Sequence, residues 1–337
     1  MNNKHLKRYP LACLPTPLHS LDKTTELLEA GKMFIKRDDL TGRILGGNKL
    51  RKLEYIVSKA LEEKADVLVT TGSFESNHVC LTCAVASMLG LKASVVLMGH
   101  EDDFNESYNY KIESKLNAEI HKMYYNDENR SLIGQKVSDC VDNITSEIEK
   151  NGLNPFFVPG GGCCLEGSYA FTGAFKEMDQ QMKTLGHDEY DVVLAVGTGS
   201  TFSGLWCGGQ LYNKKVNIKG VSIARSNPRC IEETAKACNV LNEYLYLEQV
   251  KPDQLDIADA FVGEGYGRKT DISKSGVDLG LKNEGILFDH TYAGKAFGAM
   301  TDLIKRKEIG ERPIVFWHTG GIAGSIDAEY QVEKEPN

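Results

Sequence analysis

Short runs of β-branched and other apolar residues recur along the chain, each followed by a turn and then by a segment with helical periodicity. The runs cover residues 33–36, 66–72, 93–98, 155–158, 192–196, 220–223 and 314–317. Because nearly continuous apolar runs are typical of strands buried on both faces, they indicate parallel strands. Their alternation with helical segments predicts an α/β fold built from βαβ units.

Two of the helical segments show their period most clearly. Apolar residues recur every three or four positions in residues 50–61 and again in residues 79–89. This spacing is typical of amphipathic helices that bury one face. The chain has 337 residues, which corresponds to about two domains at roughly 150 residues each.

Composition and charge exclude several classes of partner. The net charge is −8 and no long Lys/Arg block occurs, so we expect no nucleic-acid partner, because phosphate backbones require a basic stripe. No apolar run reaches the roughly 18 residues of a membrane span. The first 18 residues contain three prolines and do not resemble a secretory signal.

The nine cysteines predict free thiols. Cys80 and Cys83 lie three residues apart on a predicted helix, and Cys163 and Cys164 are adjacent. Neither arrangement fits a zinc site, which requires four ligands in tetrahedral geometry. We therefore expect no metal and a cytoplasmic protein in a reducing compartment.

A glycine- and hydroxyl-rich turn follows the strand predicted at residues 192–196. It reads Gly-Thr-Gly-Ser-Thr over residues 197–201 and opens a helical segment. Free backbone N–H groups and the positive end of a helix dipole suit a phosphate. The turn matches neither a Walker loop nor a G-x-G-x-x-G motif, which disfavours a Rossmann dehydrogenase. A tight turn with a Ser/Thr cap is the alternative interpretation.

A basic cluster opens the helix predicted at residue 48. Gly46 and Gly47 lead into Lys49, Arg51 and Lys52. Basic residues are unfavourable in a first helical turn, so the cluster predicts a compensating anion. Lys49 and Lys52 are three residues apart and share a face. Ordinary solvated lysines are the alternative.

A third group lies where the strand of residues 66–72 ends. Ser76, Asn77 and His78 present a hydroxyl, an amide and an imidazole at a helix start, although Ser76 is also an ordinary N-cap residue. No G-x-S-x-G motif of a hydrolase is present. A lysine near a phosphate cradle, without a nucleotide motif, points to pyridoxal 5′-phosphate (PLP), whose aldehyde binds a lysine amine covalently.

These motifs resemble those of the fold-type II PLP-dependent enzymes, and within them the family of 1-aminocyclopropane-1-carboxylate (ACC) deaminase and D-cysteine desulfhydrase. The matching elements keep their order over nearly the whole chain: Pro-Thr-Pro-Leu at 15–18, Lys-Arg-Asp-Asp-Leu at 36–40, Gly-Gly-Asn-Lys-Leu-Arg-Lys-Leu-Glu at 46–54, Ser-Asn-His at 76–78, Val-Gly-Thr-Gly-Ser-Thr at 196–201, Gly-Glu-Gly-Tyr-Gly at 263–267, Tyr-Ala-Gly-Lys at 292–295 and His-Thr-Gly-Gly at 318–321.

The resemblance implies a role for each matched residue. Lys49 would carry PLP, and Lys49, Ser76, Tyr266 and Tyr292 would be catalytic. The other cofactor-binding residues would be Asn48, Lys52, Asn77, Gly197, Thr198, Gly199, Ser200, Thr201 and Thr319, with Thr319 facing the pyridine nitrogen. The substrate would contact Ser76, Asn77, His78 and Cys163.

The same resemblance implies an architecture. It is a two-domain α/β fold like that of the tryptophan synthase β chain, with parallel sheets flanked by helices. Residues 1–49 plus 161–337 would form a large PLP-binding domain, and residues 50–160 a small one. A homodimer and a small amino-acid substrate are implied as well.

Departures from the family pattern guide the choice of substrate. Ala293 follows Tyr292, where ACC deaminases typically carry Glu and desulfhydrases Thr. The sequence therefore favours α,β-elimination on D-cysteine, giving pyruvate, ammonia and hydrogen sulfide. Glu75 and Cys163 also depart from the family and leave the substrate open. The alternatives are ACC deamination, L-cysteate sulfo-lyase activity and, from another class, a non-catalytic phosphate- or nucleotide-binding protein.

Overall fold

The computed structural model describes residues 5–44, 46–100, 107–126 and 132–322. Within this part of the chain the residues form two compact units. The smaller unit contains residues 5–11 and 53–162, and the larger unit contains residues 12–52 and 163–322. Since compactness alone does not show which segment folds independently, the domain boundaries at residues 49/50 and 160/161 stay a prediction.

The larger unit is built on a six-stranded sheet. Its strands lie in the order β1 (Leu18–Ser20), β2 (Met33–Arg37), β10 (Ile314–His318), β7 (Asp191–Val196), β8 (Asn217–Ser222) and β9 (Asp256–Ala258). All neighbours pair in parallel except β1, which is antiparallel to β2. The carboxyl ends of β7 and β10 therefore lie at the same edge of the sheet, where ligands bind in such folds.

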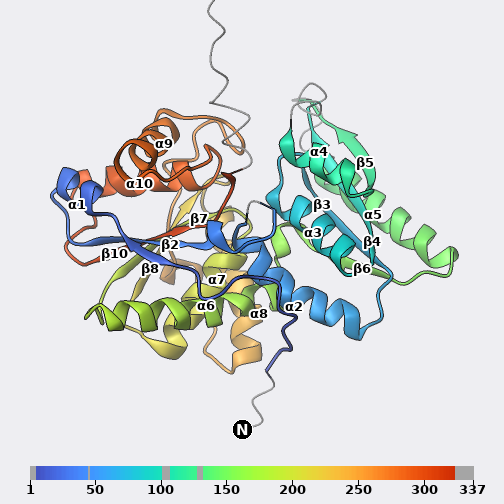
Figure 1. Cartoon of the computed structure of the whole chain (residues 1–337), viewed down its shortest axis with the longest axis horizontal. Coiled ribbons are helices and arrows are strands. Elements are labelled where there is room, and N and C mark those ends of the chain that lie inside the picture. The colour runs from blue at the N-terminus through green and yellow to red at the C-terminus, as the bar shows by residue number, and fades with distance from the viewer. Residues whose placement is uncertain (1–4, 45, 101–106, 127–131, 323–337) are drawn as a thin grey trace, which may run out of the picture. The chain divides into compact units, whose positions relative to one another are not determined.

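Helices cover both faces of this sheet. They are α1 (Asp22–Leu28), α6 (Leu165–Thr184), α7 (Ser200–Tyr212), α8 (Arg229–Leu245), α9 (Asp271–Glu284) and α10 (Ala293–Lys305). Helices α9 and α10 lie on one side, and α6, α7 and α8 on the other (Figure 1). The apolar core on the α10 side includes Phe288, Phe297 and Phe316, whose rings pack within 4.9–5.6 Å of one another between centroids.

The smaller unit contains a parallel four-stranded sheet. The order is β5 (Glu119–Tyr124), β4 (Lys92–Gly99), β3 (Val67–Ser73) and β6 (Pro155–Val158). Val67 and Val69 pack against α5 (Ile133–Lys150). Thr70 faces the other way and contacts α3 (Asn77–Met88), since successive strand side chains point to opposite faces. Helix α4 (Tyr108–Lys115) packs on α3. Helix α2 (Asn48–Glu62) begins in the larger unit and ends in the smaller one.

The predicted α/β class is confirmed. A strand occurs at each of the seven predicted positions, and the predicted helices at residues 50–61 and 79–89 correspond to α2 and α3. Strands β1, β5 and β9 were not predicted. None of the described helices is long and apolar enough to cross a membrane.

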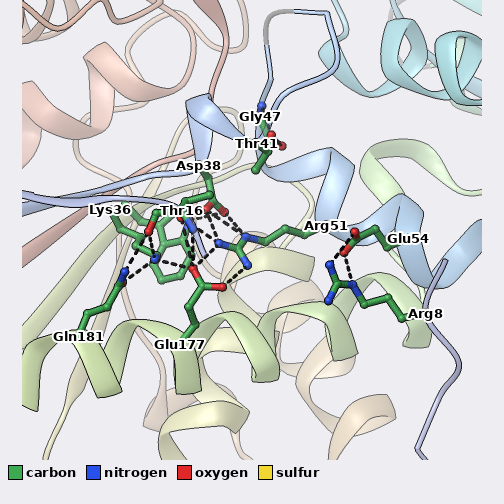
Figure 2. A network of polar contacts seen from close by, with 11 residues as sticks. Arg8, Thr16, Lys36, Asp38, Thr41, Gly47, Arg51, Glu54, Glu177 and Gln181 are labelled. Atoms are coloured by element: carbon green, nitrogen blue, oxygen red, sulfur yellow. Dashed lines mark hydrogen bonds and ion pairs between the residues drawn. The ribbon is translucent and has the colours of Figure 1, made fainter. Parts of the chain in front are cut away.

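A network of four charges fixes the start of α2 within the larger unit (Figure 2), and three of them, Lys36, Asp38 and Arg51, are buried. The Arg51 guanidinium donates to both Asp38 oxygens at 2.9–3.0 Å and to both Glu177 oxygens at 2.9–3.0 Å. Lys36 Nζ donates to Glu177 Oε1 at 2.6 Å. Two cations thus face two carboxylates, which is the condition for keeping charges away from water.

Neutral groups complete the network and join distant segments. Thr16 Oγ1 accepts from Arg51, Trp317 Nε1 donates to Asp38 Oδ2 at 3.0 Å, and Gln181 Oε1 accepts from Lys36 at 2.6 Å. The network therefore connects α2 with the end of β2, with β10 and with α6. It also corrects one expectation, because the anions that compensate Arg51 are Asp38 and Glu177 of the protein itself and not a ligand.

Replacing Glu177 should destabilise the protein in a pH-dependent manner. Burial alone would raise the pKa of Glu177, but Arg51 and Lys36 lower it to about 2. A depressed carboxyl pKa stabilises the folded state above the ordinary value near 4.5 and loses this effect as the pH falls toward 2. Glu177→Gln should lower the free energy of unfolding at pH 7 by about 3 kcal/mol, measured by denaturant titration, and the difference should shrink below pH 4.5.

Glu189→Gln is the matched control for this experiment. Glu189 forms an exposed ion pair with Lys215, and such pairs contribute little. Its replacement should leave the unfolding midpoint nearly unchanged. Equal losses in the two variants, or a Glu177→Gln effect that does not vary with pH, would contradict the network's role.

Candidate active site

Lys49 lies in the first turn of α2 in an environment that disfavours its charge. Its Nζ donates to Asn48 Oδ1 at 2.9 Å. Burial and then the charge of Lys52 lower the pKa of Lys49 well below 10.5, and Asp289 and Cys163 offset only part of this effect. A lysine with a lowered pKa is uncharged more often near neutral pH, which is the form that attacks a carbonyl group.

Asn48 joins the three segments that surround this amine. Its backbone N–H donates to the carbonyl of Thr319 at 2.9 Å, just beyond β10. Its side-chain amide donates to Thr201 Oγ1 at 3.0 Å, in the first turn of α7. Its Oδ1 accepts from Lys49. One side chain thus brings the starts of α2 and α7 together with the end of β10.

The turn between β7 and α7 has the form of an anion site. Gly199 occupies the N-cap position of α7 with φ of +87°. Because glycine has no side chain to cap the helix, the first-turn N–H groups can serve as donors to an anion. Cys163 Sγ donates to the carbonyl of Thr198 at 3.3 Å, so Cys163 lies against this turn.

Lys52 adds a buried cation to the same region. It is 2% exposed, and burial lowers its pKa to about 8 although Cys163 and Cys164 act in the opposite direction. Its Nζ lies 5.9 Å from the centroid of the Phe171 ring. An anionic group beside Lys52 would offset the cost of burying the ammonium.

Two tyrosine hydroxyls meet near Lys49. Tyr266 Oη and Tyr292 Oη form a 2.5 Å hydrogen bond, and Lys49 Nζ lies 6.0 Å from the centroid of the Tyr292 ring. Asp289 holds this end of α10, because its carboxylate accepts from the backbone N–H of Thr291, Tyr292 and Ala293 at 2.7–2.9 Å. Burial raises the pKa of Asp289 to about 6 in spite of these bonds.

The predicted residues of the smaller unit lie together at the start of α3. Ser76 is the N-cap residue, and its Oγ accepts from Val79 N at 3.4 Å. Asn77 Oδ1 accepts from Asn109 Nδ2 at 3.1 Å, and the same Asn109 amide donates to the carbonyl of Glu75 at 2.8 Å. This fixes the orientation of the Asn77 amide. The His78 ring is buried, with Nε2 3.1 Å from Thr70 Oγ1.

The structure thus brings the predicted residues of the larger unit together: Lys49, Asn48, Lys52, Cys163, Gly197, Thr198, Gly199, Ser200, Thr201, Tyr266, Tyr292 and Thr319. Ser76, Asn77 and His78 belong to the smaller unit. Sequence reasoning missed two contributors. Asp289 could have been found, since an acid before a predicted helix is a capping signal. Asn109 lies 32 residues from Asn77 and has no local signal.

Comparison with known proteins identifies the class of protein that has this fold and site. The family model described as pyridoxal-phosphate dependent enzyme matches residues 10–320. A D-cysteine desulfhydrase of Klebsiella pneumoniae is 33% identical over 326 residues, which cover 95% of this chain and 97% of that protein. A Pyrococcus furiosus protein named "Putative 1-aminocyclopropane-1-carboxylate deaminase" is 31% identical over 311 residues, or 92% of this chain and 91% of that one.

Solved structures agree with the sequence comparisons. An ACC deaminase homologue superposes with a TM-score of 0.84 at 30% identity, covering 95% of this chain and 93% of that one. A solved threonine deaminase has the same fold, with a TM-score of 0.62 at 17% identity over 91% and 92% of the two chains. The chain belongs to the family of pyridoxal-phosphate-dependent enzymes, and its cofactor is PLP.

The residues on the larger unit fit this cofactor. An amine of lowered pKa suits the PLP aldehyde, while the glycine-capped start of α7 and the buried Lys52 suit its phosphate. The family assignment also confirms that the chain is an enzyme. The interpretation as a non-catalytic phosphate- or nucleotide-binding protein is therefore wrong.

Replacing Gly199 should weaken cofactor binding. Alanine disfavours a positive φ, and its Cβ would lie 2.9 Å from Thr234 Oγ1 and 3.1 Å from Thr234 Cα. We expect Gly199→Ala to raise the Kd for PLP by about tenfold or more, since a left-handed residue other than glycine costs about 1–2 kcal/mol before any clash. Fluorescence titration of the apoprotein with PLP measures this value.

Gly209→Ala on the same helix is the control. A Cβ there would lie 3.7 Å from the Phe175 ring, an ordinary contact, so the variant should bind PLP like the parent protein. Unchanged PLP affinity in a folded Gly199→Ala variant would exclude the start of α7 as the phosphate site.

Proposed function

We propose that this enzyme catalyses α,β-elimination on D-cysteine, in which one substrate and one water give pyruvate, ammonia and hydrogen sulfide. The observation that carries the proposal is the arrangement of Lys49 beside two hydrogen-bonded tyrosines. A relative 33% identical over 95% of the chain, named D-cysteine desulfhydrase, supports the same substrate.

Bound PLP supplies a covalent attachment point for the substrate amine and a ring that accepts the electrons left on Cα. Lys49 would hold the cofactor in the resting enzyme. Its amine, released when the substrate amine takes its place, would remove the α-proton, a role that its lowered pKa favours. Tyr292 is the other candidate for this base.

The tyrosine pair would act on the leaving group. Tyr292 Oη would donate a proton to the departing sulfur, and Tyr266 Oη would share that proton through the 2.5 Å hydrogen bond. Thr319 would present a hydroxyl to the pyridine nitrogen. A hydroxyl leaves that nitrogen largely unprotonated, so the ring withdraws electrons weakly, which suits elimination at Cβ.

Other residues would bind the substrate and the cofactor. Asn77 would donate to the ring hydroxyl, since its Oδ1 already accepts from Asn109. Ser76 would bind the substrate carboxylate, with His78 and Cys163 assigned to substrate contact by the resemblance.

ACC deamination is the second candidate because relatives bear that name. Position 293 argues against it. Ala293 is 1% exposed and belongs to the apolar core, so no carboxylate follows Tyr292 to assist the opening of a cyclopropane ring. L-Cysteate sulfo-lyase activity is a third candidate, which sulfite release distinguishes.

A homodimer and a cytoplasmic location are part of the same proposal. The family resemblance supports the dimer, which sedimentation of the holoenzyme tests. The free thiols of all nine cysteines support a reducing compartment.

A substrate panel tests the choice among these reactions. Holoenzyme is supplied with D-cysteine, L-cysteine, L-cysteate, ACC or D-serine, and keto acid, sulfide and sulfite are measured. We expect sulfide and pyruvate in equal amounts from D-cysteine. Release of 2-oxobutyrate from ACC without sulfide from D-cysteine would contradict the proposal.

Removal of the Lys49 amine should abolish both cofactor attachment and turnover. Lys49→Ala should lack the visible absorption of lysine-bound PLP and lose activity by about a thousandfold or more. Lys59→Ala replaces an exposed lysine of the same helix and should retain both properties. Retention of the absorption band in Lys49→Ala would mean that another lysine carries PLP.

A further inference from the structure

Lys295 is unusual for a lysine both in its position on a helix and in its burial. It is the third residue of α10, a position near the positive end of the helix dipole where acids are preferred. Its side chain is 0% exposed, although lysines are almost never fully buried. Burial lowers its pKa, and the nearby Asp289 carboxylate opposes this effect.

The ammonium of Lys295 is directed at the loop of residues 261–268. Its Nζ donates to the carbonyl of Val262 at 2.9 Å and to the carbonyl of Gly265 at 3.3 Å. This loop contains three residues with positive φ, Gly263, Gly265 and Gly267. One backbone hydrogen bond is found inside it, from Arg268 to Gly265, and another joins Val262 to Asp259 just before it. A glycine-rich loop of this kind has much conformational freedom to lose.

Tyr266 follows directly after the carbonyl that Lys295 holds. Its hydroxyl reaches back to Tyr292, which is the N-cap residue of α10. Tyr292 and Lys295 therefore start from the same helical turn. Tyr292 contacts the hydroxyl of Tyr266, and Lys295 contacts the backbone carbonyl of the preceding residue, Gly265.

We propose that Lys295 is a positioning residue that clamps the loop of residues 261–268 to α10, so that the Tyr266 hydroxyl stays hydrogen-bonded to Tyr292. The proposed function is needed only to explain what the tyrosine pair does in the reaction. The clamp itself is a property of the protein with or without substrate.

Hydrogen exchange of the loop tests the clamp without any activity measurement. Lys295→Met keeps the aliphatic stem but removes the ammonium. In this variant, loaded with PLP, the amides of residues 261–268 should exchange about tenfold faster or more, while strands β7 and β10 stay protected. Lys305→Met, at the exposed end of the same helix, should change neither. Unaltered exchange of the loop in Lys295→Met would overturn the proposal.

A double-mutant cycle shows whether Lys295 acts through Tyr266. Lys295→Met should lower kcat with the confirmed substrate by about tenfold to a hundredfold. In a Tyr266→Phe background the same substitution should lower kcat less than about twofold, because the hydroxyl it positions is gone. Additive losses would show a general structural effect and reject the clamp mechanism. If no tested substrate is turned over, the proposed function fails, and the exchange experiment still decides the clamp.

Gly265→Ala disturbs the same contact at the acceptor, the Gly265 carbonyl. It tests the clamp if Lys295→Met does not fold. Gly265 has φ of +120°, which alanine rarely adopts, so its carbonyl should move away from Lys295. The loop should then exchange faster although Lys295 is present. Normal loop exchange in a folded Gly265→Ala variant would contradict the proposal.

Discussion

The contact of the buried Arg51 with Asp38 and Glu177 determines where Lys49, the proposed catalytic lysine, can lie. Removing one partner from such a network leaves a charge buried without compensation, so the four charges must stay together. Arg51 is two residues beyond Lys49 on α2, and a helix turns by about 100° per residue. With Arg51 held against the carboxylates, Lys49 and Lys52 are turned to a different face. A basic cluster that looks uniform in the sequence is thus divided into Arg51, which holds the helix, and two lysines that the proposed function assigns to the cofactor.

Three helices begin near the Lys49 amine, and the residues at their positive ends differ. Helix α2 places Lys49 and Lys52 there, and α7 has an uncapped glycine turn, so both ends favour an anion. Helix α10 has Asp289, whose carboxylate accepts three backbone N–H groups and neutralises its end. Asn48 joins the starts of these two helices through Thr201. The larger unit therefore separates two helix starts that suit a phosphate from the turn that presents the Tyr292 phenol.

Local sequence signals predicted the most apolar elements, which are buried on both faces except at the edge strand β6. Their strands contain continuous apolar runs, whereas β5 is a half-exposed edge strand rich in polar residues, and β1 and β9 have only three residues each. The site residues likewise divide into those with a local sequence signal and those without one. The turn at residues 197–201 and the lysines of α2 are visible as motifs. Asn109 and Lys295 act through contacts 32 and 30–33 residues away, which no local pattern encodes. The interpretation of Ser76 as an N-cap residue is confirmed by its bond to Val79, and this does not exclude a second role.

The substitution of Ala at position 293 has a structural as well as a chemical consequence. Ala293 lies in the apolar core between two polar neighbours, Tyr292 and Lys295, on one helical turn. Residues two apart on a helix do not face each other, so a carboxylate at position 293 would enter the apolar core without lying beside Lys295. Lys295 itself contacts the carbonyls of the loop, and in the proposed clamp this loop sets the position of Tyr266. The reaction that the first turn of α10 favours would then depend on a tyrosine held by backbone contacts instead of an acid on the helix itself. This is consistent with protonating a leaving sulfur, which requires a phenol in place and not a second negative charge.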